Sequence, residues 1–276
     1  MMNFLPGSQP KTQHLALPGG RIGYDVQGAG PCVLLLPGMG ELRSSYRFLV
    51  PRLVKAGYMV VTADLRGHGD SDSTFDSYGD VETASDIAAM LRHIGSPAAV
   101  LGNSMSAGSA VIAAAEHPEL VEALVLLGPF VRNPAHVSWF ERLLLRVMMG
   151  GPWARVLWNA FVPILYSGRK PEDFKDYRKS MTAAMKRPGH TKAFRLTTRT
   201  DHGPAERALA SVQAPAMVVM GSRDPDFKDP AAEAAWVGTT LGGEVVMVDD
   251  AGHYPHAQQP QVTAAAIVEF LGGGAS

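Results

Sequence analysis

Short apolar runs recur along this chain, and each leads directly into a glycine-rich or acidic turn. The run at 33–36 (VLLL) enters PGMG, and the run at 60–63 (VVTA) enters DLRGHGDS. Continuous apolar runs of about four to eight residues are typical of strands that are buried on both faces of a sheet. The pattern predicts strands at 21–26, 32–36, 58–63, 98–102, 122–128, 215–220 and 244–248. Because helical segments separate many of them, we expect an α/β fold with a mostly parallel central sheet and helices on both faces.

The alternation of strands and helices stops in the middle of the chain. After Pro129, apolar side chains recur at helical spacing, beginning with Trp139, Phe140, Leu143 and Leu144. We therefore predict three parts: a first portion of the α/β core at 1–130, a helical insertion at 131–205, and a second portion of the core at 206–276.

The composition is that of a compact protein without a disulfide framework. Hydrophobic residues make up 46% of the 276 residues and charged residues 18%, which argues against disorder. Cys32 is the only cysteine, and its place beside the run at 33–36 predicts a buried packing residue. No run reaches the roughly 18 to 20 apolar residues of a membrane span. The N-terminus lacks the basic start and apolar stretch of a signal peptide, so we expect a cytoplasmic location.

A serine lies where the run at 98–101 meets a stretch of small residues that is typical of a helix. The local sequence is GNSMS at 102–106, with Ser104 at its centre. A serine hydroxyl is a weak nucleophile, so it must be held on a sharp turn, near a base and beside amides that receive an oxyanion. The usual pattern is Gly-x-Ser-x-Gly, and here Ser106 replaces the second glycine. We predict that Ser104 is a nucleophile; the alternative is a serine that caps the helix.

An acidic candidate follows a later strand. The run at 217–220 enters GSRDPD at 221–226, and open α/β sheets carry their sites beyond the carboxyl ends of their strands. Asp224 lies closest to the strand end and is the predicted acid, with Asp226 and Asp229 as competitors. The alternative for Asp224 is a turn aspartate before Pro225.

Histidine candidates follow the last strand. The run at 245–248 enters DDAGHYPH at 249–256. His253 and His256 both lie in this segment, and His253 is the predicted base. A third histidine, His68, lies in the glycine-rich turn at 64–71, where a structural role is expected because His253 already occupies the position of a base.

The chain order Ser, Asp, His resembles the α/β-hydrolase superfamily and differs from both serine-protease orders. The resemblance implies a catalytic triad of Ser104, Asp224 and His253, the first histidine of GHYPH being the base. The segment at 37–40 looks like the oxyanion loop of this family. An oxyanion hole would then consist of the backbone N–H groups of Met39 and Met105. The resemblance also implies that the insertion at 131–205 forms a helical lid over the site, and that the reaction needs neither metal nor cofactor.

The same resemblance implies a serine hydrolase that cleaves a small to medium carboxylic ester or lactone through an acyl-enzyme. The segment GNSM at 102–105 is also similar to the elbow of C–C bond hydrolases that split dienoate products of aromatic ring cleavage. In those enzymes the residue that corresponds to Asn103 helps to bind substrate. The Ser-x-Ser elbow is similar to bacterial stress-regulator hydrolases and plant strigolactone receptors, which implies a slow sensor of small molecules as a third alternative. A serine at the elbow argues against epoxide and haloalkane hydrolases, which use aspartate there.

The predicted insertion is strongly basic. Residues 131–205 contain 14 Lys and Arg but only 5 Asp and Glu, although the whole chain has a net charge of −1. Such helices can face solvent or dock on an acidic body. Alternatively, they steer an anionic small-molecule substrate into a cleft. Weak contact with a membrane surface or nucleic acid is the third possibility, but no aromatic stacking motif accompanies the charge, so nucleic acid is not an expected partner.

Overall fold

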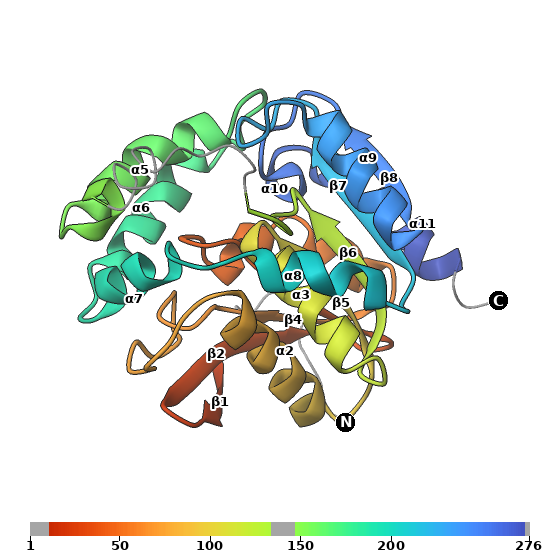
Figure 1. Cartoon of the computed structure of the whole chain (residues 1–276), viewed down its shortest axis with the longest axis horizontal. Coiled ribbons are helices and arrows are strands. Elements are labelled where there is room, and N and C mark those ends of the chain that lie inside the picture. Colours follow the sequence, from red (N-terminus) through yellow and green to blue (C-terminus); the bar gives the residue numbers. More distant parts are fainter. Residues whose placement is uncertain (1–10, 134–146, 274–276) are drawn as a thin grey trace.

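A sheet of eight strands runs through the part of the chain that the computed structural model describes, residues 11–133 and 147–273. Its spatial order is β1-β2-β4-β3-β5-β6-β7-β8 (Figure 1). The hairpin β1–β2 and the pair β2–β4 are antiparallel, and all other pairs are parallel. The strands are β1 (Gln13–Leu17), β2 (Gly20–Gln27), β3 (Cys32–Leu36), β4 (Met59–Ala63), β5 (Ala98–Asn103), β6 (Val121–Leu127), β7 (Ala216–Gly221) and β8 (Glu244–Val248).

This sheet confirms the predicted α/β fold, and the seven predicted strands are present within one or two residues of their expected ends. The prediction missed β1. Its sequence, QHLAL, alternates between intermediate and exposed positions at the edge of the sheet. A strand of this kind contains no continuous apolar run, so the pattern used to find the other strands could not detect it.

Helices cover both faces of the sheet, because successive side chains of the central strands point to opposite sides. On β3, Leu34 and Leu36 pack in one core cluster and Val33 and Leu35 in another. The first cluster includes side chains of α2 (Asp80–Ile94), α3 (Met105–Glu116) and α9 (Pro230–Leu241). The second includes side chains of α1 (Val50–Lys55) and α11 (Pro260–Gly273). Cys32 is buried in the first cluster, as predicted.

Local signals explain where the covering helices begin and end. α2 has acidic residues in its first turn and ends at Gly95, whose φ is 81°. In α9, Pro230 occupies the first turn and the Asp229 side chain accepts a hydrogen bond from Ala232 N–H. These are the N-terminal proline, aspartate cap and C-terminal glycine that favour helix ends.

The helices between β6 and β7 lie partly away from the sheet. α5 (Ala154–Leu165), α6 (Phe174–Met185) and α7 (His190–Thr197) form a group at the left of Figure 1, whereas α8 (Gly203–Ala208) lies against α3. Side chains from α5, α6 and α7 form a third apolar cluster, which also contains Tyr254 and Ala257 of the main body. Trp139, Phe140, Leu143 and Leu144 lie outside the described residues.

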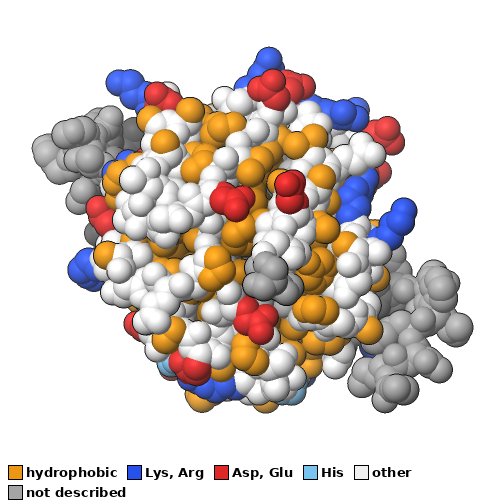
Figure 2. All heavy atoms as spheres, turned by 90° about the vertical axis from the view of Figure 1, so that its right-hand side faces the viewer, with side chains coloured by type: hydrophobic (Ala, Val, Ile, Leu, Met, Phe, Trp, Pro, Cys, Tyr) orange, Lys and Arg blue, Asp and Glu red, His pale blue; other side chains and the backbone are white. Residues whose placement is uncertain are grey.

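β8 forms the edge of the sheet opposite to β1. Val245 and Met247 on this edge strand are exposed. Figure 2 shows the molecule from the side on which α9, β8 and α11 lie in Figure 1, and apolar side chains are spread over that face with few charged ones between them. Among the described helices, none is long and apolar enough to cross a membrane.

Candidate active site

Ser104 connects β5 to α3 in a strained backbone conformation. Its φ is 58° and its ψ is −123°, a backbone conformation that residues other than glycine rarely adopt. The Ser104 N–H donates to the carbonyl oxygen of Leu127 at 2.9 Å, and the Ser104 carbonyl oxygen accepts from the Phe130 N–H at 3.2 Å. A Cβ atom at Gly102 would lie 2.4 Å from the carbonyl oxygen of Ser106. Glycine therefore allows strand and helix to cross closely, which is the geometry of a nucleophile elbow.

Asp224 and His253 meet beyond the carboxyl ends of β7 and β8. His253 Nδ1 lies 2.7 Å from Asp224 Oδ2, and both side chains are buried. Asp226 Oδ2 lies 3.6 Å from the same ring nitrogen. Burial lowers the pKa of His253, but the nearby charges of Asp224 and Asp226 outweigh this effect and raise the pKa to about 9. The pair has the geometry of an imidazole that is oriented by a carboxylate.

Asn103 joins the elbow to this pair, and Gly128 leaves space for it. Asn103 Nδ2 donates to the carbonyl oxygens of Leu127 and His253, at 3.0 and 3.2 Å. A Cβ atom at Gly128 would lie 3.1 Å from Asp224 Oδ2 and 3.1 Å from His253 Nδ1. Glycine after β6 thus leaves room for the acid and the imidazole. Ser104, Asp224 and His253 follow the carboxyl ends of β5, β7 and β8, and among the described residues a hydrogen bond joins Asp224 to His253 but none joins His253 to the Ser104 hydroxyl.

The segment at 37–40 passes directly over the elbow. A Cβ atom at Gly38 would lie 3.0 Å from Ser104 Cβ. From the first turn of α3, Ser106 Oγ donates to the carbonyl oxygen of Pro37 at 2.6 Å. The serine that replaces the second glycine of the usual elbow pattern therefore ties the start of α3 to this loop.

His68 supports the same loop from the body. Its Nδ1 lies 2.8 Å from the Arg66 carbonyl oxygen, and its Nε2 lies 3.0 Å from the Gly40 nitrogen. These contacts require a neutral ring with the proton on Nδ1, because Nε2 accepts the Gly40 N–H. Burial accordingly lowers the pKa of His68 to about 4. His68 thus has a structural role, as its sequence context predicted.

The two predicted oxyanion amides have no hydrogen-bond partner among the described residues. Met105 is the first residue of α3, where backbone N–H groups have no partner within the helix. Within residues 11–133 and 147–273, no protein acceptor pairs with the N–H of Met39 or of Met105. Both groups are therefore available to an oxygen that carries negative charge.

Two of the three rival candidates lie in other environments, whereas Asp226 lies beside His253. Asp229 caps α9. His256 is fully buried against the Tyr46 ring, with 4.6 Å between ring centroids, and burial lowers its pKa to about 3. Among the described residues, neither side chain forms a hydrogen bond with His253 or Ser104.

Three donor atoms of this site could in principle surround a cation. Oxygens of Asp224 and Asp226 and a nitrogen of His253 lie within 4.8 Å of one another. The His253 nitrogen that faces the two carboxylates is Nδ1. This nitrogen forms the 2.7 Å contact with Asp224, which is the arrangement of an imidazole and its orienting acid.

Comparison with known proteins identifies the family of this chain. The profile of the alpha/beta hydrolase family matches residues 33–266. The chain belongs to the alpha/beta hydrolase family. It is therefore a hydrolase with an α/β-hydrolase fold.

Several relatives of this hydrolase are similar over most of their length. A 2-(acetamidomethylene)succinate hydrolase of Mesorhizobium japonicum is 28% identical over 268 residues, which cover 91% of this chain and 92% of that protein. A pimeloyl-[acyl-carrier protein] methyl ester esterase of Neisseria meningitidis is 28% identical over 249 residues, which cover 87% and 77% of the two chains. A solved esterase of Thermogutta terrifontis shares the fold, with a TM-score of 0.80 at 22% identity over 98% of this chain and all of that one.

Sequence reasoning did not single out two residues of this site. Gly128 ends an apolar run as many glycines do, so no local signal marks its contact with the acid and the base. Glu41 follows the oxyanion loop and is fully buried, although a charged residue in a turn is normally exposed.

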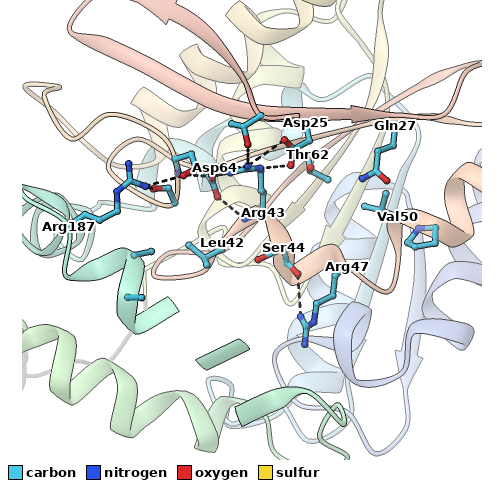
Figure 3. Close-up of a pocket in the computed structure, with 16 residues that line it drawn as sticks. Asp25, Gln27, Leu42, Arg43, Ser44, Arg47, Val50, Thr62, Asp64 and Arg187 are labelled. Carbon is cyan, nitrogen blue, oxygen red and sulfur yellow. Dashed lines mark hydrogen bonds and ion pairs between the residues drawn. The ribbon is translucent and has the colours of Figure 1, made fainter. Parts of the chain in front are cut away.

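An open pocket of about 790 Å³ lies elsewhere on this hydrolase (Figure 3). Its lining includes residues 42–44 and Arg47, which follow the oxyanion loop, but none of the triad residues. The Arg43 guanidinium at its centre pairs with Asp25 and Asp64, and Arg187 pairs with Asp70. Because these charges are already matched, we assign no substrate to this pocket.

Proposed function

We propose that this hydrolase cleaves a small to medium carboxylic ester or lactone, with Ser104 as the nucleophile, His253 as the base and Asp224 as the acid. The observation that carries the proposal is the buried 2.7 Å contact between His253 Nδ1 and Asp224 Oδ2. The residue before Ser104 is hydrogen-bonded to the backbone of the same histidine. Activated serine hydroxyls require this combination of an elbow, a base and an orienting acid.

The residues suggest a two-step reaction. His253 takes the proton of Ser104 Oγ as this oxygen attacks the substrate carbonyl, and Asp224 stabilises the resulting imidazolium. The N–H groups of Met39 and Met105 receive the oxyanion, a contribution of roughly 3–4 kcal/mol per donor. The leaving alcohol takes the proton from His253 and departs, leaving an acyl-enzyme. Water then gives a proton to His253 as its oxygen attacks the acyl carbonyl, and His253 passes this proton to Ser104 Oγ as the acid departs, which restores the free enzyme.

The name of one relative favours esters over the dienoate alternative, and the bonding of Asn103 limits how this residue contacts a substrate. The Neisseria meningitidis relative is an ester hydrolase by name. In addition, Asn103 Nδ2 already donates to two backbone carbonyls. Its predicted substrate contact therefore depends on Oδ1, which has no hydrogen-bond partner among the described residues.

Steady-state hydrolysis of p-nitrophenyl esters from acetate to octanoate, by wild type and Ser104→Ala, tests the proposal. A homoserine lactone, a ring-cleavage dienoate and 2-(acetamidomethylene)succinate complete the substrate panel. We expect multiple turnovers of at least one ester or lactone and their loss in Ser104→Ala, with an unchanged far-UV spectrum. A fluorophosphonate probe should add its mass to wild type only.

Other outcomes select the alternatives. Preference for the dienoate would indicate a C–C bond hydrolase, and one slow turnover with tight ligand binding would indicate a sensor. If Ser104→Ala retained the wild-type rate, the nucleophile assignment would be wrong.

Measuring kcat/KM for neutral and carboxylate-bearing esters at rising salt tests steering by the basic insertion, because steering weakens with ionic strength only for the anionic substrate.

A further inference from the structure

The insertion helices contact three consecutive residues that follow the oxyanion amide of Met39. The Tyr177 hydroxyl on α6 donates to Glu41 Oε2 and accepts from the Leu42 N–H at 3.3 Å. Trp158 Nε1 on α5 donates to the Gly40 carbonyl oxygen at 3.4 Å. The end of the loop is therefore held by side chains that lie more than 100 positions away in the sequence.

The buried carboxyl group of Glu41 destabilises the folded state. Its side chain is fully buried, and Oε1 has no hydrogen-bond partner among the described residues. Burial raises the pKa of Glu41 to about 7, although the hydrogen bond from Tyr177 and the charges of Arg47 and His253 lower it. An apolar side chain could fill the space without this cost. Packing alone therefore does not explain a carboxyl group here.

The surroundings of Glu41 come from several elements. Four buried tyrosines lie around Glu41, on η1 (Arg43–Tyr46), at the end of α5, on α6 and before α10 (Pro255–Gln258), and burial together with the Glu41 charge raises the pKa of each. The titratable and charged groups that face Glu41 are Tyr46, Tyr166, Tyr177, Tyr254, Arg47 and His253.

We propose that the Tyr177–Glu41 pair is a positioning device that holds the oxyanion loop so that the Met39 amide faces Ser104. The inference rests on the proposed function and adds residues that act through the loop. His68 holds Gly40 from the body, and the pair holds the next two residues from the insertion. The Met39 side chain packs against the body core and the insertion cluster at once. A displacement of about 1 Å in such a donor lowers rates by about a hundredfold.

The test uses a double-mutant cycle with p-nitrophenyl butyrate and separate values of kcat and KM. Tyr177→Phe and Glu41→Ala should each lower kcat about tenfold or more while KM stays within about twofold, because a misplaced oxyanion donor acts on the transition state. The double variant should be no worse than the poorer single variant. Glu41→Gln keeps an acceptor for Tyr177 and should retain most of kcat.

A matched control is available on the same helix. In the described part of the chain, Thr182 Oγ1 bonds to the Arg178 carbonyl oxygen within α6 and to no other group, so Thr182→Val should leave kcat within about twofold of wild type. Inhibition by phenylboronic acid, which forms a tetrahedral adduct, supplies a second readout. Tyr177→Phe should weaken this inhibition about as much as it lowers kcat. Thermal unfolding of every variant shows whether a lower kcat reflects unfolding of that variant alone.

Different results would overturn the positioning role of the Tyr177–Glu41 pair and the proposed function. Equal kcat for Tyr177→Phe and Thr182→Val, with turnover lost in Ser104→Ala, would reject the positioning role and leave the proposed function intact. Lower kcat with unchanged boronate inhibition, or fully additive losses in the double variant, would also reject it. Turnover that survives Ser104→Ala would reject the proposed function itself.

Discussion

At the scale of single residues, the backbone of Ser104 is the clearest mark of function. Non-glycine residues with positive φ cost about 1–3 kcal/mol and persist where the surrounding structure enforces them. Here the hydrogen bonds to Leu127 and from Phe130 enforce φ of 58°. A serine at the start of a helix, needed only as a cap, would not require this conformation.

The strain leads to a prediction that separates stability from activity. Ser104→Gly and Ser104→Ala should both lack turnover, but the glycine variant should be more stable by about 1 kcal/mol, because glycine adopts positive φ at little cost. Urea denaturation of the two variants measures the difference. Equal midpoints would show that the turn stores no strain.

His253 between two acids predicts the pH dependence of hydrolysis. Only the neutral ring can accept the serine proton, and its pKa is about 9, so kcat/KM should rise with pH until about pH 9. Asp226→Asn removes one of the charges that raise this pKa and should move the rise to lower pH. Each unit of decrease in pKa increases the neutral fraction at pH 7 about tenfold.

Asp229→Asn is the matched control for that experiment. Asp229 caps α9 at a distance from the imidazole, and asparagine caps helices equally well. Its pH–rate profile should coincide with that of wild type. A profile of Asp226→Asn that also coincides would contradict the assignment of His253 as the titrating base.

At the scale of elements, the junction of α3 with the oxyanion loop depends on one hydroxyl. Ser106 and Ser109 are both fully buried on α3, but Ser106 bonds to Pro37 in the loop, whereas Ser109 bonds to Met105 in its own helix. Ser106 therefore connects two elements that the chain separates by 69 positions.

We predict that Ser106→Ala destabilises the protein by about 1–3 kcal/mol, because it leaves the buried Pro37 carbonyl oxygen without its donor. It should also lower kcat, since the loop that carries Met39 loses an anchor. Ser109→Ala is the control and should leave kcat unchanged. Calorimetry together with ester hydrolysis checks both values, and equal kcat in the two variants would contradict the anchoring role.

At the scale of the whole molecule, opposite charges join the basic insertion to the acidic body. Arg187 pairs with Asp70 at 3.1 Å. With the polarity reversed, Asp173 beside α6 pairs with Arg47 at 2.6 Å. These pairs agree with helices that dock on the body, although partly exposed ion pairs contribute little each. Steering of anionic substrates stays a separate prediction for the salt experiment.

Buried Glu41 predicts how global stability changes with pH. Its pKa is raised from 4.5 to about 7, so the folded state holds a proton that the unfolded state loses between these values. The associated stability is fully present below pH 4.5 and is lost as pH rises through about 7, a loss of about 3 kcal/mol. Glu41→Gln should therefore gain stability relative to wild type at pH 8 and little at pH 4, as urea titrations at the two pH values would show.

The amino-acid sequence by itself determined the fold class and the positions of the predicted nucleophile, acid and base. Each of these is a local pattern, an apolar run followed within a few residues by a turn that carries one reactive side chain. Such patterns repeat in many chains because strand burial and turn geometry depend on neighbouring residues. Edge strand β1 was missed because it is half exposed and therefore lacks the run.

Only the tertiary structure decided which distant groups meet. Nothing near Glu41 in the sequence indicates that Tyr177, 136 positions later, reaches its carboxyl group. The contact of Gly128 with Asp224 and His253 likewise depends on how three strands align in the sheet. Contacts of this kind arise from packing between elements, which no single segment encodes, so they became visible only when the folded chain brought the elements together.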